Sequence, residues 1–115
     1  METPYIIDLE NHVDNRGHLT VTTGIPFTPV RAFWIGGVPL DAVRGAHAHR
    51  TQHQLLICVC GAVNVNEFEL NEPYHGLYVP PMNIITMKHF SPGAVLLVLS
   101  SGAYDAQDYV TESES

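Results

Sequence analysis

Two histidines separated by one residue are the feature of this sequence best suited to chemistry. His47 and His49 lie in the segment Arg44-Gly45-Ala46-His47-Ala48-His49. In a β-strand, residues two apart share a face, so both imidazoles would project into one cavity. Imidazole is a good metal ligand, and its unperturbed pKa of about 6.5 suits proton transfer near neutral pH. The pattern therefore indicates a proton-transfer or metal site, unless the pair is merely solvated on a strand edge.

The residues that follow bear on the choice between metal and proton chemistry. In the first cupin motif, His-x-His is followed by Glu after four intervening residues and then by Gly after six more. Here Gln54 stands at the Glu position and Gly61 at the Gly position. Counting from Pro80, the third histidine of the second motif is replaced by Ile85. Two imidazole nitrogens alone hold a divalent ion weakly, so we expect no metal, no cofactor, and direct acid and base work by the histidines. The remaining histidines are single residues expected to be solvated: His12, His18, His53, His75 and His89.

The elements that must position the pair are short and β-rich, with turn residues between them and little helical periodicity. The predicted class is therefore all-β, with a short helical turn between Ala103 and Tyr109 and a frayed tail over 111–115. Residues 1–115 are expected to form one domain. The predicted strands are Tyr5–Leu9, His18–Thr23, Arg31–Ile35, Ala42–His49, Gln54–Cys60, Ala62–Phe68, Gly76–Val79, Ile84–Met87 and Ala94–Ser100.

Composition narrows the partners. The chain of 115 residues carries 12 acidic and 5 basic side chains, a formal charge of −7, which argues against nucleic-acid binding. No apolar stretch is long enough to span a membrane and no signal pattern opens the chain, so we expect a cytoplasmic protein that does not bind membranes. Cys58 and Cys60 are expected to be reduced core thiols, because a disulfide between residues two apart on one strand is strained.

Two apolar runs without alternation predict strands buried on both faces. These are Leu55-Leu56-Ile57 and Val95-Leu96-Leu97-Val98-Leu99. Packing against a second copy would explain them, and from the small size of the chain we expect a homodimer. Burial within the monomer by a neighbouring sheet is the alternative.

At this point the sequence resembles the WxcM-like cupins, which include the TDP-4-keto-6-deoxyhexose 3,4-ketoisomerases. The resemblance rests on ordered segments along nearly the whole chain, which are Asp14-Asn15-Arg16-Gly17-His18-Leu19, Ile25-Pro26-Phe27, Arg31 with Phe33-Trp34-Ile35, the His47 segment, Leu56-Ile57-Cys58 with Gly61, Gly76 to Pro81, Phe90 to Leu99, and Tyr104-Asp105 with Asp108-Tyr109. It implies a small RmlC-like jelly-roll β-barrel of the cupin type.

The resemblance also implies a reaction. Such enzymes convert a TDP-linked 4-keto-6-deoxyhexose to its 3-keto isomer without a metal, through an enediol or enediolate. We expect His49 to move the carbon proton and His47 to serve the sugar oxygens. Arg44 is expected near the nucleotide diphosphate, with Arg16 and Arg31 as secondary contacts and Gln54 and Tyr78 near the substrate.

Three departures from the family pattern keep other functions open. Ile84-Ile85-Thr86 stands where relatives place polar groups, the longer hairpin that relatives carry between Ala62 and Leu70 is expected to be shortened or missing, and tyrosines near Phe33 and Trp34 are absent. A catalytically silent cupin that binds a sugar nucleotide or stabilises a partner enzyme is therefore the alternative. A metal-dependent cupin, such as a small dioxygenase, and a 3,5-epimerase are further hypotheses.

Overall fold

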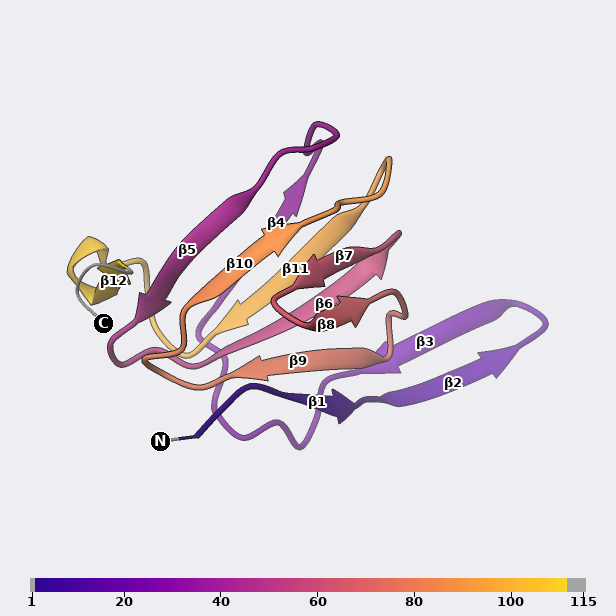
Figure 1. The fold of residues 1–115 in the computed structure, drawn as a ribbon. Helices are drawn as coiled ribbons and strands as arrows, with labels where there is room; N and C mark the ends of the chain where they lie inside the picture. The colour runs from indigo at the N-terminus through magenta and orange to yellow at the C-terminus, as the bar shows by residue number, and fades with distance from the viewer. Residues whose placement is uncertain (1, 112–115) are drawn as a thin grey trace.

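Two five-stranded antiparallel sheets face each other in the computed structural model, which describes residues 2–111 (Figure 1). The first sheet has the order β1 (Tyr5–Asp8), β9 (His75–Val79), β6 (Gln54–Cys60), β11 (Val95–Ser100) and β4 (Arg31–Gly36). The second has the order β12 (Tyr109–Thr111), β5 (Arg44–His49), β10 (Ile85–Lys88), β7 (Val63–Val65) and β8 (Phe68–Leu70). A 3-10 turn, η1 (Ala106–Asp108), precedes β12.

The core lies between the sheets because alternate side chains of each strand point inward. On β4 the pattern is regular: Phe33 and Ile35 pack against the core, whereas Trp34 between them is 71% exposed on the outer face. The inner cluster takes residues from both sheets, including Leu56, Val63, Ile85, Leu96 and Val98. The predicted jelly roll therefore takes the form of two facing sheets, which within residues 2–111 remain separate hydrogen-bonded ladders.

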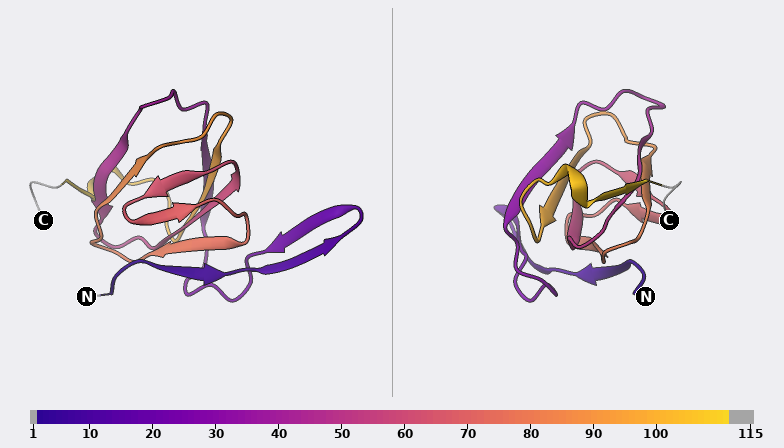
Figure 2. Two further views of the ribbon diagram at one scale, coloured as in Figure 1. Left: turned by 45° about the vertical axis from the view of Figure 1, so that its right-hand side comes forward. Right: turned by 90° about the vertical axis from the view of Figure 1, so that its left-hand side faces the viewer.

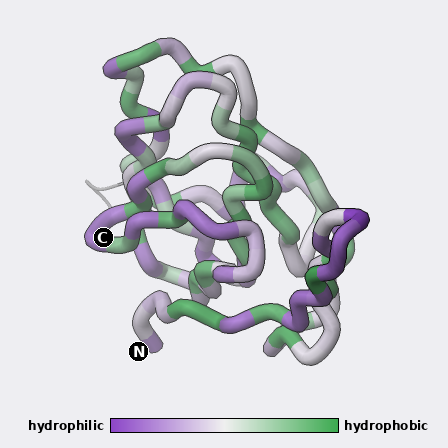
Figure 3. The backbone as a smooth tube through the Cα atoms, turned by 90° about the vertical axis from the view of Figure 1, so that its right-hand side faces the viewer, coloured by the Kyte–Doolittle hydropathy of each residue, from purple (hydrophilic) through white to green (hydrophobic). Residues whose placement is uncertain are grey.

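A hairpin of β2 (Glu10–Asp14) and β3 (Gly17–Val21) extends away from the sandwich (Figures 1 and 2). Its strands pair only with each other, and its turn residues are exposed. In Figure 3 hydrophobic colouring follows the sheet strands, whereas the hairpin turn is hydrophilic. Val13 and Leu19 are nevertheless 73% and 59% exposed, so the hairpin carries apolar side chains that its own chain leaves uncovered.

The all-β class and the short helical turn are confirmed, but three elements differ from the sequence prediction. The predicted strand Ala62–Phe68 is a tight hairpin: Asn66 adopts a left-handed φ of 52°, and β7 pairs back with β8. Asn tolerates this conformation, whereas the alternating valines before it suggested a continuous strand. The expected loss of the hairpin in this region was therefore wrong.

Strands β2 and β12 were both missed because neither sequence alternates regularly between apolar and polar residues. Polar side chains occupy both faces of β2, and β12 is three residues long and exists through its pairing with β5. Thr111, predicted to begin a frayed tail, ends β12; the rest of that predicted tail, 112–115, lies outside the described residues.

The two apolar runs are covered largely from within the chain. Leu55, Ile57 and Tyr78 form a second cluster on the outer face of the first sheet with Leu9, and further apolar side chains of the same chain pack on it: Ile7, Ile25, Phe27, Leu97 and Leu99. These runs alone therefore do not require a second copy.

Of the two cysteines, Cys58 is buried as predicted, whereas Cys60 is exposed, so the expectation that both lie in the core was half wrong. The strand register shifts between Val95 and Leu96, beside this pair, which takes Cys60 out of the regular alternation. Both thiols are free. Separately, no helix within residues 2–111 is long and apolar enough to cross a membrane.

Replacing Gly45 tests the packing of β5 on β10. Gly45 has a φ of +100°, and a Cβ there would lie 2.6 Å from the carbonyl oxygen of Ile85. Gly93 has a φ of +75° with nothing within 4 Å. We expect Gly93→Ala to cost about 1 kcal/mol of unfolding free energy through backbone strain alone, and Gly45→Ala at least ~2 kcal/mol. Urea unfolding of both variants measures the difference, and equal costs would contradict the close approach.

Candidate active site

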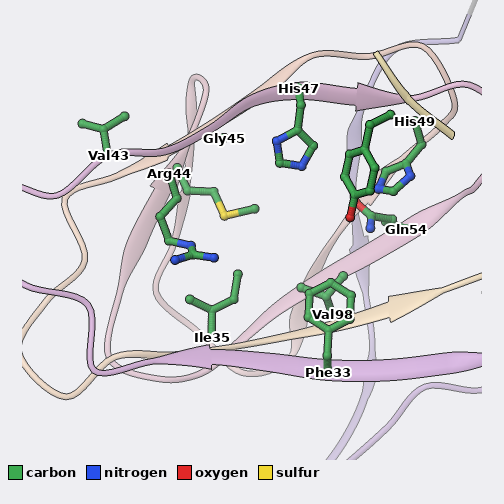
Figure 4. Close-up of a pocket in the computed structure, with 11 residues that line it drawn as sticks. Phe33, Ile35, Val43, Arg44, Gly45, His47, His49, Gln54 and Val98 are labelled. Carbon is green, nitrogen blue, oxygen red and sulfur yellow. The ribbon is translucent and has the colours of Figure 1, made fainter. Parts of the chain in front are cut away.

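A cavity of about 350 Å³ lies between the two sheets, at the end where β4 and β5 face each other (Figure 4). One wall comes from β5, with β10 and β12 beside it; the other comes from β4 and β11, and β6 closes the space between them. Its lining is Phe33, Ile35, Val43, Arg44, Gly45, His47, His49, Gln54, Met87, Val98 and Tyr109. The walls are thus largely apolar, with a few converging polar groups, as in small-molecule sites.

Both sequence-predicted histidines project into this cavity from one face of β5 (Figure 4). Their ring centroids are 6.2 Å apart, and His49 is only 6% exposed. The backbone before them is irregular, because Gly45 and Ala46 both have positive φ values and the pairing of β5 with β10 shifts register between Ile85 and Thr86. Because side chains alternate along a strand, this bulge sets the face on which His47 and His49 emerge.

A buried carboxylate fixes the orientation of His49. Nδ1 of His49 lies 3.0 Å from Oδ2 of Asp108, and each side chain is 6% exposed. The carboxylate also accepts hydrogen bonds from the Thr51 hydroxyl and from the backbone N–H groups of Thr51 and Gln52. A carboxylate accepts hydrogen bonds, so Nδ1 carries the proton and Nε2 is left as the basic nitrogen. This is the arrangement of an oriented general base.

The site keeps both imidazoles neutral near pH 7. Burial lowers the pKa of His47, and the positive charges of protonated His49 and of Arg44 lower it further. Burial also lowers the pKa of His49, which the pair with Asp108 opposes and Arg31 reinforces. For Asp108, burial acts to raise the pKa, but the hydrogen bonds from Thr51, His49 and Gln52 outweigh it and hold the pKa below its usual value. The site is therefore an ionised carboxylate beside neutral bases.

A tyrosine that sequence reasoning did not assign completes this wall. Tyr109 is paired directly with His49 across β12 and β5, so the two side chains share a face. Its ring centroid lies 4.6 Å from that of His49 and 5.0 Å from that of His47. Neither Asp108 nor Tyr109 was predicted as a site residue, and the one available signal was the Asp108-Tyr109 pair among the family-like segments.

The three arginines proposed for substrate binding lie in different places. Arg44 lines the cavity at the end away from His49 (Figure 4). Arg31 lies beside the His49 end: its guanidinium stacks on Phe33 at 5.0 Å and donates to Gln52, while its buried Nε has no hydrogen-bond partner within residues 2–111. Arg16 lies in the hairpin turn, paired with Asp14, and does not line the cavity of its own chain.

Gln54 and Tyr78 lie on opposite faces of the first sheet. Gln54, 6% exposed, lines the cavity from β6. Tyr78 is paired with Leu55, the next residue along β6, so it points to the opposite face of the sheet, where its hydroxyl lies 2.7 Å from Nδ1 of His53. The assignment of Tyr78 as a substrate contact is therefore corrected: it belongs to the outer core. The five other histidines also lie outside the cavity lining.

Within residues 2–111, no three His, Cys, Asp or Glu side chains gather in a way that could hold a metal ion. Ile85, at the place of the third cupin histidine, is paired with His47 and is 2% exposed in the core. From the divergent segment Ile84-Ile85-Thr86 no residue lines the cavity; the nearest contribution of β10 is Met87. The departure thus alters the core beside His47 rather than the cavity lining.

Known proteins resemble this chain over nearly its full length. Residues 2–115 match the family described as FdtA, WxcM-like, C-terminal. The chain is 32% identical to the TDP-4-oxo-6-deoxy-alpha-D-glucose-3,4-oxoisomerase of Aneurinibacillus thermoaerophilus over 121 residues, covering 96% of this chain and 87% of that protein.

Solved structures give the same family and confirm the fold. A double mutant of the 3,4-ketoisomerase QdtA from Thermoanaerobacterium thermosaccharolyticum, in complex with TDP, is 39% identical with a TM-score of 0.92, covering 98% of this chain and 90% of its own. A His-to-Asn mutant of QdtA, in complex with TDP-4-keto-6-deoxyglucose, is 37% identical at the same TM-score and coverage. The 3,5-epimerase RmlC of Legionella pneumophila is 16% identical with a TM-score of 0.79 over 94% of this chain and 71% of its own, and shows the RmlC-like fold alone.

The pH dependence of stability tests the neutral histidines. The pKa values of both histidines in the folded protein lie below the usual value of 6.5, so the unfolded chain binds more protons as pH falls. Stability from this source is complete above about pH 6.5 and is lost as pH falls below it. The lowered pKa of Asp108 adds a further loss below the usual carboxyl value of 3.8. We expect urea unfolding to give a lower free energy at pH 5.5 than at pH 7.5.

A variant with both His47→Asn and His49→Asn provides the control. It should show a smaller difference in unfolding free energy between pH 7.5 and 5.5, because the two titrating groups are gone. A difference as large as in the unmodified protein would assign the pH effect to other groups.

Proposed function

Because this chain belongs to the FdtA, WxcM-like C-terminal family, we propose that it is a sugar-nucleotide 3,4-ketoisomerase of deoxysugar biosynthesis. Its substrate is a TDP-linked 4-keto-6-deoxyhexose, and its product is the 3-keto isomer. The observation that carries this proposal is the buried His49–Asp108 pair beside His47 in one cavity. The free thiols of Cys58 and Cys60 fit a reducing, cytoplasmic location.

The reaction requires only proton movements, which the cavity can supply. The C4 ketone acidifies the hydrogen on C3, and neutral His49 takes that proton on Nε2, because Nδ1 is held by Asp108. Asp108 stabilises the imidazolium that forms, as an oriented carboxylate does beside a catalytic histidine. His47, on the same face of β5, passes the proton between O3 and O4 of the resulting enediolate.

Cationic side chains at the two ends of the cavity suit an anionic substrate. Arg44 lines the end away from His49, where a guanidinium can pair with the nucleotide diphosphate while the sugar lies over the histidines. Gln54 offers an amide to the sugar hydroxyls from the floor. Beside the other end, Arg31 has a buried Nε without a hydrogen-bond partner within residues 2–111, and supplies a secondary donor.

Isotope exchange tests the ketoisomerase reaction. In deuterated water, incubation with TDP-4-keto-6-deoxyglucose should yield the 3-keto isomer and exchange of carbon-bound hydrogen, followed by NMR. His49→Asn should reduce both by at least ~10²-fold, because the base is lost, while TDP binding measured by calorimetry stays nearly unchanged. His89→Asn, which changes an exposed histidine outside the cavity, is the matched control and should retain full activity.

The alternative, a catalytically silent cupin that binds a sugar nucleotide, predicts binding without isomerisation. In that case TDP binds, yet neither exchange nor product appears with the unmodified protein. Turnover that survives His49→Asn would instead refute the assignment of the base.

We propose further that the chain acts as a homodimer. The outer face of the first sheet exposes Trp34 and, less fully, Val59, next to the half-buried Leu97 that pairs with Trp34. The projecting hairpin adds exposed Val13 and Leu19 (Figure 2). Exposed apolar side chains of this size favour association, and a second copy is the simplest partner. Since Arg16 lies outside the cavity of its own chain, any role for it in substrate binding requires the cavity of that second copy.

Light scattering after size-exclusion chromatography tests this association. We expect the mass of two chains for the unmodified protein and of one chain for Trp34→Lys, because a charge buried in an apolar interface is costly. Leu40→Lys, at a residue that is 69% exposed in the loop between β4 and β5, should leave the mass unchanged. A monomer without any substitution would rule the dimer out.

A further inference from the structure

The hydroxyl of Tyr109 is the polar group of the cavity that the reaction has not yet used. Tyr109 lies on β12 directly opposite His49, and its ring packs against both imidazoles. Within residues 2–111 no hydrogen bond is found for this hydroxyl, whereas Tyr78, buried elsewhere, has its hydroxyl held by His53. A tyrosine hydroxyl beside two bases, opposite a largely apolar wall, is available to a ligand.

Resting on the ketoisomerase reaction, we propose that Tyr109 is the acid that protonates C4 of the sugar, from the same face on which His49 removes the proton of C3. The titratable residues of the lining are Arg44, His47, His49 and Tyr109. His49 holds the C3 proton and His47 serves the oxygens, while a guanidinium keeps its proton throughout. Besides the imidazolium of His49, Tyr109 is the lining group that can give a proton to carbon, and we assign it the C4 step because its hydroxyl lies in the cavity without a partner within residues 2–111.

The step balances without any further reactant. The C3–H bond breaks and its proton goes to Nε2 of His49, leaving an enediolate with its charge on O4. His47 carries the O3 proton to O4, so that the charge moves to O3. The C3=O3 bond then forms as C4 takes the phenolic proton of Tyr109. The imidazolium of His49, whose ring centroid lies 4.6 Å from that of Tyr109, finally returns a proton to the phenolate, and both groups regain their initial state.

The shared wall has a stereochemical consequence. His49 and Tyr109 are cross-strand partners on one face of neighbouring strands, whereas Phe33 and Ile35 stand on the facing sheet. Both protons therefore cross the same face of the sugar ring. In a 4-keto-6-deoxyglucose the C3 hydrogen lies on the face opposite the methyl group, so the new C4 hydrogen lies there too. The C4 hydroxyl is then axial, on the methyl side, which is the galacto configuration.

Tyr109→Phe is the decisive variant because it keeps the ring and removes only the hydroxyl. We expect kcat for 3-keto product to fall about 10²–10³-fold while TDP binding is retained. In deuterated water the variant should still exchange the C3 hydrogen of unreacted substrate, because His49 is intact and the enediolate returns to substrate. Tyr104→Phe is the matched control: Tyr104 is 67% exposed and outside the lining, so activity should be unchanged.

The NMR spectrum of the product supplies the second readout. A small H4–H5 coupling, from an equatorial H4, supports delivery from the His49 face; a large coupling overturns it. Unchanged turnover in Tyr109→Phe, or equal loss of turnover and C3 exchange, overturns the acid role, since the latter marks a damaged base. An unmodified protein that binds TDP but neither exchanges nor isomerises the sugar refutes the proposed reaction itself, and this inference with it.

Discussion

The contact between His49 and Asp108 is the interaction on which the site depends. A buried imidazole and a buried carboxylate are each costly alone, and each is satisfied here by the other and by the turn at Thr51 and Gln52. The contact also joins β5 to the C-terminal segment, because η1 places Asp108 immediately before β12. The same contact therefore both orients the His49 ring and fixes the C-terminal segment to β5.

The same pairing explains why the proton-transferring side chains of the cavity lie together on one wall. Once β12 lies beside β5, Tyr109 must stand next to His49, since directly paired residues of antiparallel strands share a face. The facing sheet contributes mainly apolar surface from Phe33, Ile35 and Val98. A low-polarity wall opposite a polar one favours neutral bases, in agreement with the lowered pKa values of His47 and His49. In the proposed reaction, proton transfer is thus confined to one side of the sugar.

The first sheet serves two purposes with its two faces. Its inner face closes the cavity through Gln54 and Phe33, and its outer face holds the second core around Leu55 and Tyr78. Long apolar strands without alternation are needed for this double burial. Where that second core ends, near Trp34, the described part of the chain leaves the sheet exposed, and the proposed dimer would cover it there.

The sequence by itself determined the all-β class, most of the strands and the central pair of His47 and His49, because a period of two along a strand is a local property. Motif spacing also predicted Gln54 at the site, and the family resemblance predicted Arg44 there; both line the cavity. Only the tertiary structure decided the partners of these residues. Asp108 and Tyr109 lie about sixty residues beyond the histidines, and their role arises from long-range pairing of β12 with β5. Tyr78 failed as a site residue for the same reason: one step along β9 moves a side chain from one face of the sheet to the other.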